Sequence, residues 1–100
     1  MAVSSSVTDE GNSVLITIVG KFDVYLHQDF RNCYRNENPE AAYTLDFSGT
    51  ENIDSSALGI ILLLREFAGG ENSNISIRGC NENIKKIFKY TSFDKLFSCS

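Results

Sequence analysis

Alternating apolar and polar residues predict two β-strands at the start of the chain. In residues 13–19, β-branched side chains recur at alternate positions, and the run stops at Gly20. Residues 2–7 form a second candidate strand, and the turn-forming residues 9–12 lie between the two. This arrangement predicts an opening β-hairpin.

Two segments after the hairpin have apolar residues at helical spacing. In residues 24–36 the apolar side chains recur every three or four positions, and a cluster ending at Pro39 terminates the segment. Residues 56–68 form a strongly apolar helix that ends at two consecutive glycines, 69–70. Between these helices, residues 42–47 have a continuous apolar tendency typical of a strand, which a turn at Ser48 and Gly49 would end.

The last third of the chain continues the alternation of strand and helix. Residues 74–78 predict a short strand, and Asn81 can cap a helix that follows it. The inner face of that helix would be formed by Ile84, Ile87 and Phe88, and its outer face by Lys85, Lys86 and Lys89. A final apolar turn, formed by Phe93, Leu96 and Phe97, would close the core.

This order of elements predicts an α/β fold. Strands separated by helices imply crossover connections, and hence a four- to five-stranded, mostly parallel β-sheet with an N-terminal hairpin and three to four α-helices. Sites in such sheets gather beyond the carboxyl ends of the strands. Asp23 follows the second predicted strand and Asp46 lies near the end of the third, so both could share one rim with Asp54 and Ser55.

Length and charge narrow the possible functions. One hundred residues that are 42% hydrophobic predict one compact domain, residues 1–100. A net charge of −4 with scattered basic residues argues against nucleic acid or an anionic membrane surface as a partner. Because no apolar run could span a bilayer and no signal peptide is recognisable, we expect a cytoplasmic protein without membrane insertion.

The cysteines give no sign of a metal or disulfide site. Cys33, Cys80 and Cys99 are widely spaced, and His27 is the sole histidine. We therefore expect free thiols, with neither a metal nor a cofactor.

The segment Asp54-Ser55-Ser56 carries the most distinctive candidate chemistry. It places a carboxylate and two hydroxyls at the first turn of the apolar helix, where the helix dipole favours negative charge. Ser55 is therefore a favourable position for a phosphate, and Ser56 is the second choice. The segment could also be an ordinary capped helix start, and Asp23 could equally be a plain turn residue. The lysines at 85, 86 and 89 fit a solvated helix face better than an anion site.

The same helix offers a candidate docking surface. Leu58 and Leu62 stand three and seven residues after Ser55, and therefore on the same helical face. Together with Ser56 and Gly59 they predict an apolar partner-binding patch beside the phosphate site. Most of so apolar a helix is expected to be buried, which leaves its first turn as the open part.

With these features in place, the chain resembles a single-domain STAS protein of the bacterial anti-sigma factor antagonist type. The resemblance covers nearly the whole length. It rests on GKFD at 20–23, LDF at 45–47, DSSALG at 54–59, and IKKIF at 84–88 followed by FDKLF at 93–97.

The resemblance implies a function. In that family a partner kinase phosphorylates the first serine of the turn, which corresponds to Ser55, and Asp23, Asp46 and Asp54 would surround it. Related proteins often carry asparagine at the position of Asp46, and Ala57 replaces a common glycine. The implied partners are an anti-sigma factor or serine kinase of the histidine-kinase-like ATPase type and a PP2C-type phosphatase. The unmodified protein would bind its regulator, and phosphorylation would release it.

Other functions fit less well. A serine hydrolase using Ser55 or Ser56 with His27 as base lacks the G-x-S-x-G elbow, and no nucleotide-binding loop that would make the chain a kinase is present. We therefore expect a protein substrate rather than an enzyme. The alternative is a STAS accessory subunit of a membrane transport assembly. The identity of the regulator, the final output (a sigma factor, biofilm, motility or another), the active phospho-form, the oligomeric state and any nucleotide binding stay open.

Overall fold

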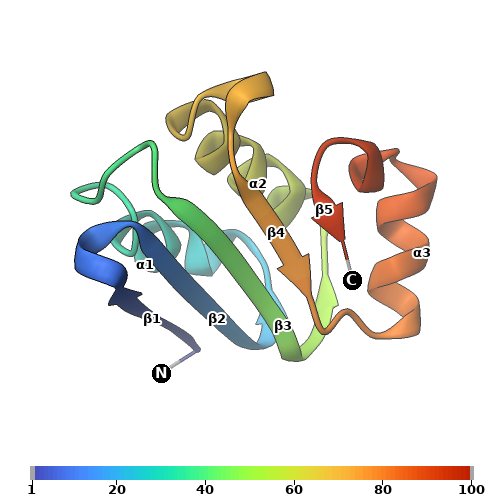
Figure 1. Cartoon of the computed structure of the whole chain (residues 1–100). Coiled ribbons are helices and arrows are strands. Elements are labelled where there is room, and N and C mark those ends of the chain that lie inside the picture. The colour runs from blue at the N-terminus through green and yellow to red at the C-terminus, as the bar shows by residue number, and fades with distance from the viewer. Residues whose placement is uncertain (1, 100) are drawn as a thin grey trace.

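A computed structural model describes residues 2–99 of the chain, which form a two-layer α/β fold (Figure 1). The five-stranded sheet has the order β1-β2-β3-β4-β5, with β1 antiparallel to β2 and the other pairs parallel. The strands are β1 (Val3–Thr8), β2 (Ser13–Phe22), β3 (Ala42–Ile53), β4 (Ile75–Arg78) and β5 (Ser98–Cys99). The helices are α1 (His27–Asn32), α2 (Ser55–Phe67) and α3 (Glu82–Tyr90), with 3₁₀ turns η1 (Asp9–Gly11), η2 (Val24–Leu26), η3 (Gly70–Asn72) and η4 (Phe93–Lys95). The predicted hairpin and mostly parallel sheet are confirmed.

The core lies between one face of the sheet and the helices. Along β3, Tyr43, Leu45 and Phe47 are buried while their neighbours are partly exposed, as expected for a sheet covered on one side. Aromatic rings join the layers: Tyr43 meets Phe67 of α2 at 6.5 Å, and Phe47 meets Phe88 of α3 at 6.1 Å between ring centroids. The opposite face of the sheet carries no helix within residues 2–99 (Figure 1).

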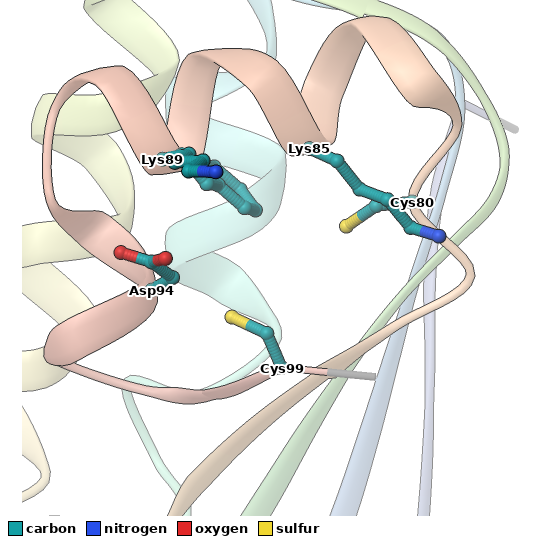
Figure 2. A pocket seen from close by; sticks show the side chains of 6 residues that line it. Cys80, Lys85, Lys89, Asp94 and Cys99 are labelled. Atoms are coloured by element: carbon teal, nitrogen blue, oxygen red, sulfur yellow. The ribbon is translucent and has the colours of Figure 1, made fainter.

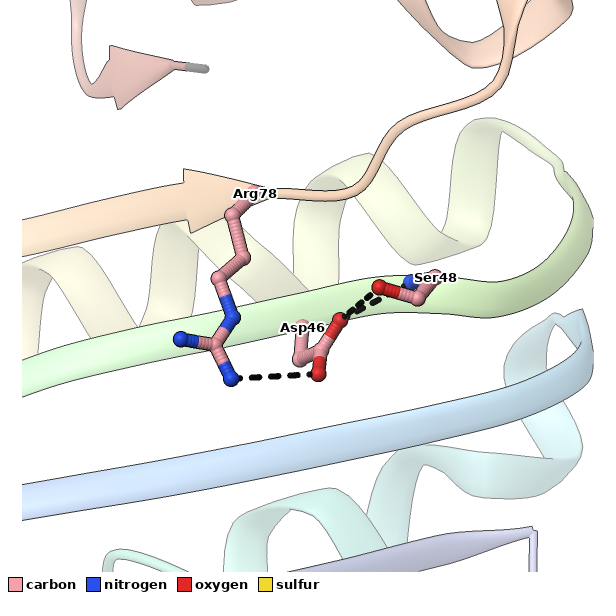
Figure 3. Close-up of polar contacts among 3 residues, drawn as sticks. All are labelled: Asp46, Ser48 and Arg78. Atoms are coloured by element: carbon pink, nitrogen blue, oxygen red, sulfur yellow. Dashed lines mark hydrogen bonds and ion pairs between the residues drawn. The ribbon is translucent and has the colours of Figure 1, made fainter.

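Strand β3 is longer than the sequence predicted. We expected it to end at Phe47, but it bends near Ser48 and continues to Ile53, which makes the predicted end wrong (Figures 1 and 3). Strand β2 also runs past Gly20, whose φ of +87° accompanies a shift in its register with β3. The hydroxyl of the buried Thr50 donates to the Ile18 carbonyl at 2.6 Å and ties the bent part of β3 to β2.

The first helix is shorter than the spacing of apolar residues in 24–36 predicted. Residues 24–36 contain η2, the six-residue α1 and then turns. At the start, the Asp23 carboxylate accepts from the Tyr25 N–H at 3.0 Å and caps the 3₁₀ turn. Phe30 and Tyr34, two of the regularly spaced apolar residues of this segment, are nevertheless buried.

Helices α2 and α3 begin where their caps predict. The Asp54 carboxylate accepts from the Ala57 N–H at 3.0 Å, and the Asn81 side-chain oxygen accepts from the Ile84 N–H at 2.9 Å. Helix α2 lies one residue earlier than residues 56–68. The final apolar turn is η4, which buries Phe93, and the sequence pattern did not resolve β5 after it. None of the helices in residues 2–99 is long and apolar enough to cross a membrane.

Candidate functional site

Two aspartates follow adjacent strands at one end of the sheet. Phe22 of β2 and Ile53 of β3 are paired, and the chain passes from them directly to Asp23 and Asp54. The Asp54 N–H also donates to the Phe22 carbonyl at 3.3 Å. Both aspartates line a hollow of about 110 Å³, together with Lys21, Phe22, Asn52 and Ile53. The structure thus places Asp23 beside Asp54, as the sequence predicted.

Both carboxylates have a structural role at this rim. Asp23 caps η2 through the Tyr25 N–H, which is the turn role that the sequence also allowed. Asp54 caps α2 through the Ala57 N–H. Each carboxylate thereby fixes the start of a helical turn without using Ser55 or Ser56.

Ser55 is the first residue of α2, directly after its cap. The side chains of Ser55 and Ser56 are both exposed. The first N–H groups of a helix have no intrahelical acceptor, and the dipole places partial positive charge there. A phosphate on Ser55 could therefore be accommodated without disturbing the cap. His27 lines a different groove, so among residues 2–99 the structure provides no sign of a serine–histidine pair.

Asp46 does not line the hollow that holds Asp23 and Asp54. Its carboxylate accepts from the Ser48 hydroxyl at 2.6 Å and the Ser48 N–H at 2.9 Å, and it pairs with Arg78 at 3.3 Å (Figure 3). These hydrogen bonds from Ser48, followed by the contribution of Arg78, lower the pKa of Asp46. The expectation that Asp46 stands at the strand end is wrong, because β3 continues to Ile53.

Helix α2 presents an apolar strip beside Ser55. Gly59, Leu62 and Leu63 are exposed, the two leucines at 37% and 49%, while Leu58 is half-buried against the core. Of the predicted docking residues, Ser56, Gly59 and Leu62 are therefore accessible, and Leu58 contributes mainly to packing.

The structure adds two docking candidates that sequence reasoning missed. Val24 and Tyr25 of η2 are 55% and 87% exposed, and η2 contacts α2. Large apolar side chains that are exposed on two elements in contact are typical of an interaction surface. Their position directly after Asp23 was an available signal, but their apolar character placed them on the predicted helix instead. We call Val24, Tyr25, Gly59, Leu62 and Leu63 the docking ridge.

A separate hollow lies between α3 and the C-terminal strand. Figure 2 shows the side chains of Cys80, Lys85, Lys89, Asp94 and Cys99 around it, and its volume is about 380 Å³. Burial raises the pKa of the Cys80 thiol to about 11, which disfavours a reactive thiolate. All three cysteines are free, and residues 2–99 contain no cluster of metal-ligating side chains.

Comparison with known proteins places this geometry in a family. Residues 5–98 match the model of a family described as "Mlab, STAS domain". A STAS-domain containing protein of Pseudomonas aeruginosa (strain UCBPP-PA14) is 41% identical over 101 residues, with 100% of both chains covered.

Solved structures share the fold at low identity. A Thermotoga maritima protein described as an anti-sigma factor antagonist superposes with a TM-score of 0.81 at 17% identity, covering 97% of this chain and 84% of that one. The anti-sigma factor antagonist SpoIIAA gives a TM-score of 0.74 in its unphosphorylated form, at 13% identity, covering 99% of this chain and 87% of that one. Its phosphorylated form, from Bacillus, gives 0.69 at 12% identity, covering 99% and 91%. From the family match and the close relative, the chain belongs to the STAS domain family.

Proposed function

We propose that this protein is a phosphorylation-switched binding module of the anti-sigma factor antagonist kind. The unmodified form binds an anti-sigma factor or a serine kinase of the histidine-kinase-like ATPase type in the cytoplasm. Phosphorylation of Ser55 releases that partner, and a PP2C-type phosphatase restores binding. The protein acts as a substrate of the kinase rather than as an enzyme.

The position of Ser55 is the observation that carries this proposal. Its hydroxyl is exposed at the first position of α2, while the neighbouring Asp54 holds the helix start. A kinase can reach the hydroxyl, and the helix N-terminus can accept the added charge. The fold is therefore expected to survive phosphorylation.

Charge explains why modification would act on binding. A phosphate adds about −1.5 to −2 charges beside Asp23 and Asp54, next to the docking ridge. A partner that covers the ridge must then desolvate this charge, at a cost of several kcal/mol unless it supplies a cation. A cost of about 3 kcal/mol corresponds to roughly a hundredfold loss of affinity.

The fold of the structural neighbours supports the same kind of function. SpoIIAA, an anti-sigma factor antagonist, has been solved in unphosphorylated and phosphorylated forms on the fold described here. The pair shows that this architecture accommodates phosphorylation in a relative.

The first experiment identifies the acceptor. The purified protein is incubated with ATP and a candidate serine kinase of the histidine-kinase-like ATPase type, and intact mass is measured for wild type, Ser55→Ala and Ser56→Ala. We expect one added phosphate in wild type and Ser56→Ala, and none in Ser55→Ala. Modification of Ser55→Ala at the wild-type rate would exclude Ser55 as the acceptor.

The second experiment measures the switch. The same kinase-type partner is titrated with wild type, Ser55→Ala, Ser55→Asp and enzymatically phosphorylated protein. Wild type and Ser55→Ala should bind alike, and the phosphoprotein roughly a hundredfold more weakly. Equal affinity of all four forms would refute the switch. Co-purification with a permease instead of a kinase would favour the alternative of an accessory subunit of a membrane transport assembly.

A further inference from the structure

A groove between α1 and α2 is separate from the proposed phosphate site. It has a volume of about 430 Å³ and is lined by His27, Arg31, Tyr34, Arg35, Leu63 and Phe67. The rings of Tyr34, in the turn after α1, and Phe67 of α2 meet at 5.0 Å between centroids and form its floor. Volumes of this size are within the range of binding pockets.

One wall of the groove is basic. His27, Arg31 and Arg35 are spaced four residues apart, and the Arg35 N–H donates to the Arg31 carbonyl at 2.9 Å, so the helical path continues to Arg35. Both arginine side chains are exposed. The ion pair found within residues 2–99 joins Arg78 and Asp46, so neither groove arginine is paired there.

The carboxylates on the same elements form no ion pair with this wall within residues 2–99. Asp29 lines a different groove, between α1 and β1. Glu37, beyond α1, and Glu66, on α2, form no ion pair with the groove arginines within the described part of the chain. The Arg35 side chain donates a long hydrogen bond to the Asn32 side-chain oxygen at 3.5 Å. Two arginines without an ion pair in the described residues therefore flank an apolar floor in a chain whose net charge is −4.

We propose that the groove is a second docking site, for an acidic segment of a partner protein that inserts an apolar side chain between α1 and α2. Its carboxylates pair with Arg31 and Arg35, and its apolar side chain packs on Leu63 and Phe67. An amphipathic helix laid in a groove between helices is an established mode of recognition. Arginine forks match carboxylates bidentately, which favours an acidic peptide as the occupant.

The groove is continuous with the docking ridge through Leu63, which belongs to both. One partner could therefore occupy both surfaces. Ser55 does not line the groove, so a peptide that occupies the groove alone is expected to bind independently of phosphorylation.

The test uses a synthetic acidic amphipathic helix with leucines at positions i, i+3, i+4 and i+7 and glutamates on both flanks. Full-length ¹⁵N-labelled protein is titrated with this peptide to about 1 mM and followed by NMR. We expect saturable shifts at the amides of Arg31, Leu63 and Phe67, and weaker binding as salt rises. The absence of shifts, or shifts confined to another surface, would overturn the proposal.

Charge reversal gives the matched comparison. The double variant Arg31→Glu with Arg35→Glu should bind the peptide at least about tenfold more weakly. The double variant Lys85→Glu with Lys89→Glu makes the same change of charge on α3 and should bind as wild type does. Equal weakening by both, or none by the first, would contradict the assignment. Urea unfolding of each variant checks that it folds.

Further measurements distinguish an acidic peptide from other possible ligands of the groove. A peptide with glutamines in place of glutamates should bind at least about tenfold more weakly, and Ser55→Asp should bind the acidic peptide as wild type does. If the kinase-type partner binds equally well with and without phosphorylation, the proposed function is refuted, but the binding of the acidic peptide in the groove is not affected. Binding of inorganic phosphate or anionic phosphatidylglycerol vesicles at the same groove, as tightly as the peptide, would overturn the protein-segment proposal. Self-association through the groove would do the same.

Discussion

Asn81 offers a substitution for which helix propensity and structure predict opposite results. Its side-chain oxygen caps α3, and its amide nitrogen donates to the carbonyls of Thr50 at 3.2 Å and Glu51 at 3.1 Å. Aspartate is as good an N-cap as asparagine, and its charge suits the helix dipole, so propensity predicts that Asn81→Asp is neutral or stabilising. The structure predicts destabilisation, because the second carboxylate oxygen would face two carbonyl oxygens.

The magnitude follows from the bonds that are lost. Each of the two hydrogen bonds from the amide contributes about 0.5–1.5 kcal/mol, and a gain of about 0.3–1 kcal/mol from the dipole opposes their loss. With repulsion between the oxygens added, and screening at this exposed residue, we expect Asn81→Asp to lower the free energy of unfolding by about 1–3 kcal/mol. For a domain of this size that is a fall in Tm of roughly 5–15 °C.

Urea unfolding followed by circular dichroism measures this effect at pH 7, provided that the m-value stays constant. Asn36→Asp, at an exposed position, makes the same change of charge and should stay within about 0.5 kcal/mol of wild type. A protonated carboxyl can donate a hydrogen bond, so the deficit of Asn81→Asp should shrink below about pH 4. If Asn81→Asp matches wild type at pH 7, the bridge from α3 to β3 is not stabilising.

Other substitutions test individual contacts by urea unfolding. Asp54→Ala should lose about 1 kcal/mol with the α2 cap, whereas Asp54→Asn should keep it, and equal losses would contradict the capping role. Thr50→Val should cost about 1–3 kcal/mol because it leaves the buried Ile18 carbonyl without its donor, and an unchanged stability would show that this bond contributes nothing. The pKa of Asp46 is lowered by Ser48, so its contribution is present above about pH 3.9 and lost as the pH falls through the lower folded value. Asp46→Asn should remove that part of the pH dependence, and an unaltered profile between about pH 6 and 2 would count against it.

The part of the site that the sequence predicted follows from chain direction. Asp23 and Asp54 each come after a β-strand, and neighbouring parallel strands end at the same edge of a sheet, so their adjacency needed no knowledge of side-chain packing. Ser55 was placed by capping rules, which depend on a few consecutive residues.

The rest depended on contacts between distant segments. Ser48 and Gly49 are turn-forming residues, and their local preference predicted that β3 would stop there. The strand continues because the Thr50 hydroxyl and the shifted register with β2 bind its second half to a neighbour about thirty residues away. Because the end of β3 was predicted too early, Asp46 was wrongly expected at the strand end. The exposure of Tyr25 was missed because helical spacing could not reveal the 3₁₀ turn that carries it.

Because the carboxylate at position 54 caps α2, the start of this helix does not depend on the Ser55 hydroxyl. Mutation could therefore replace the proposed phosphate acceptor without loss of the domain. If the proposed switch operates, a lineage could abandon it in a single step and retain a permanently active, or permanently silent, version of the same surface.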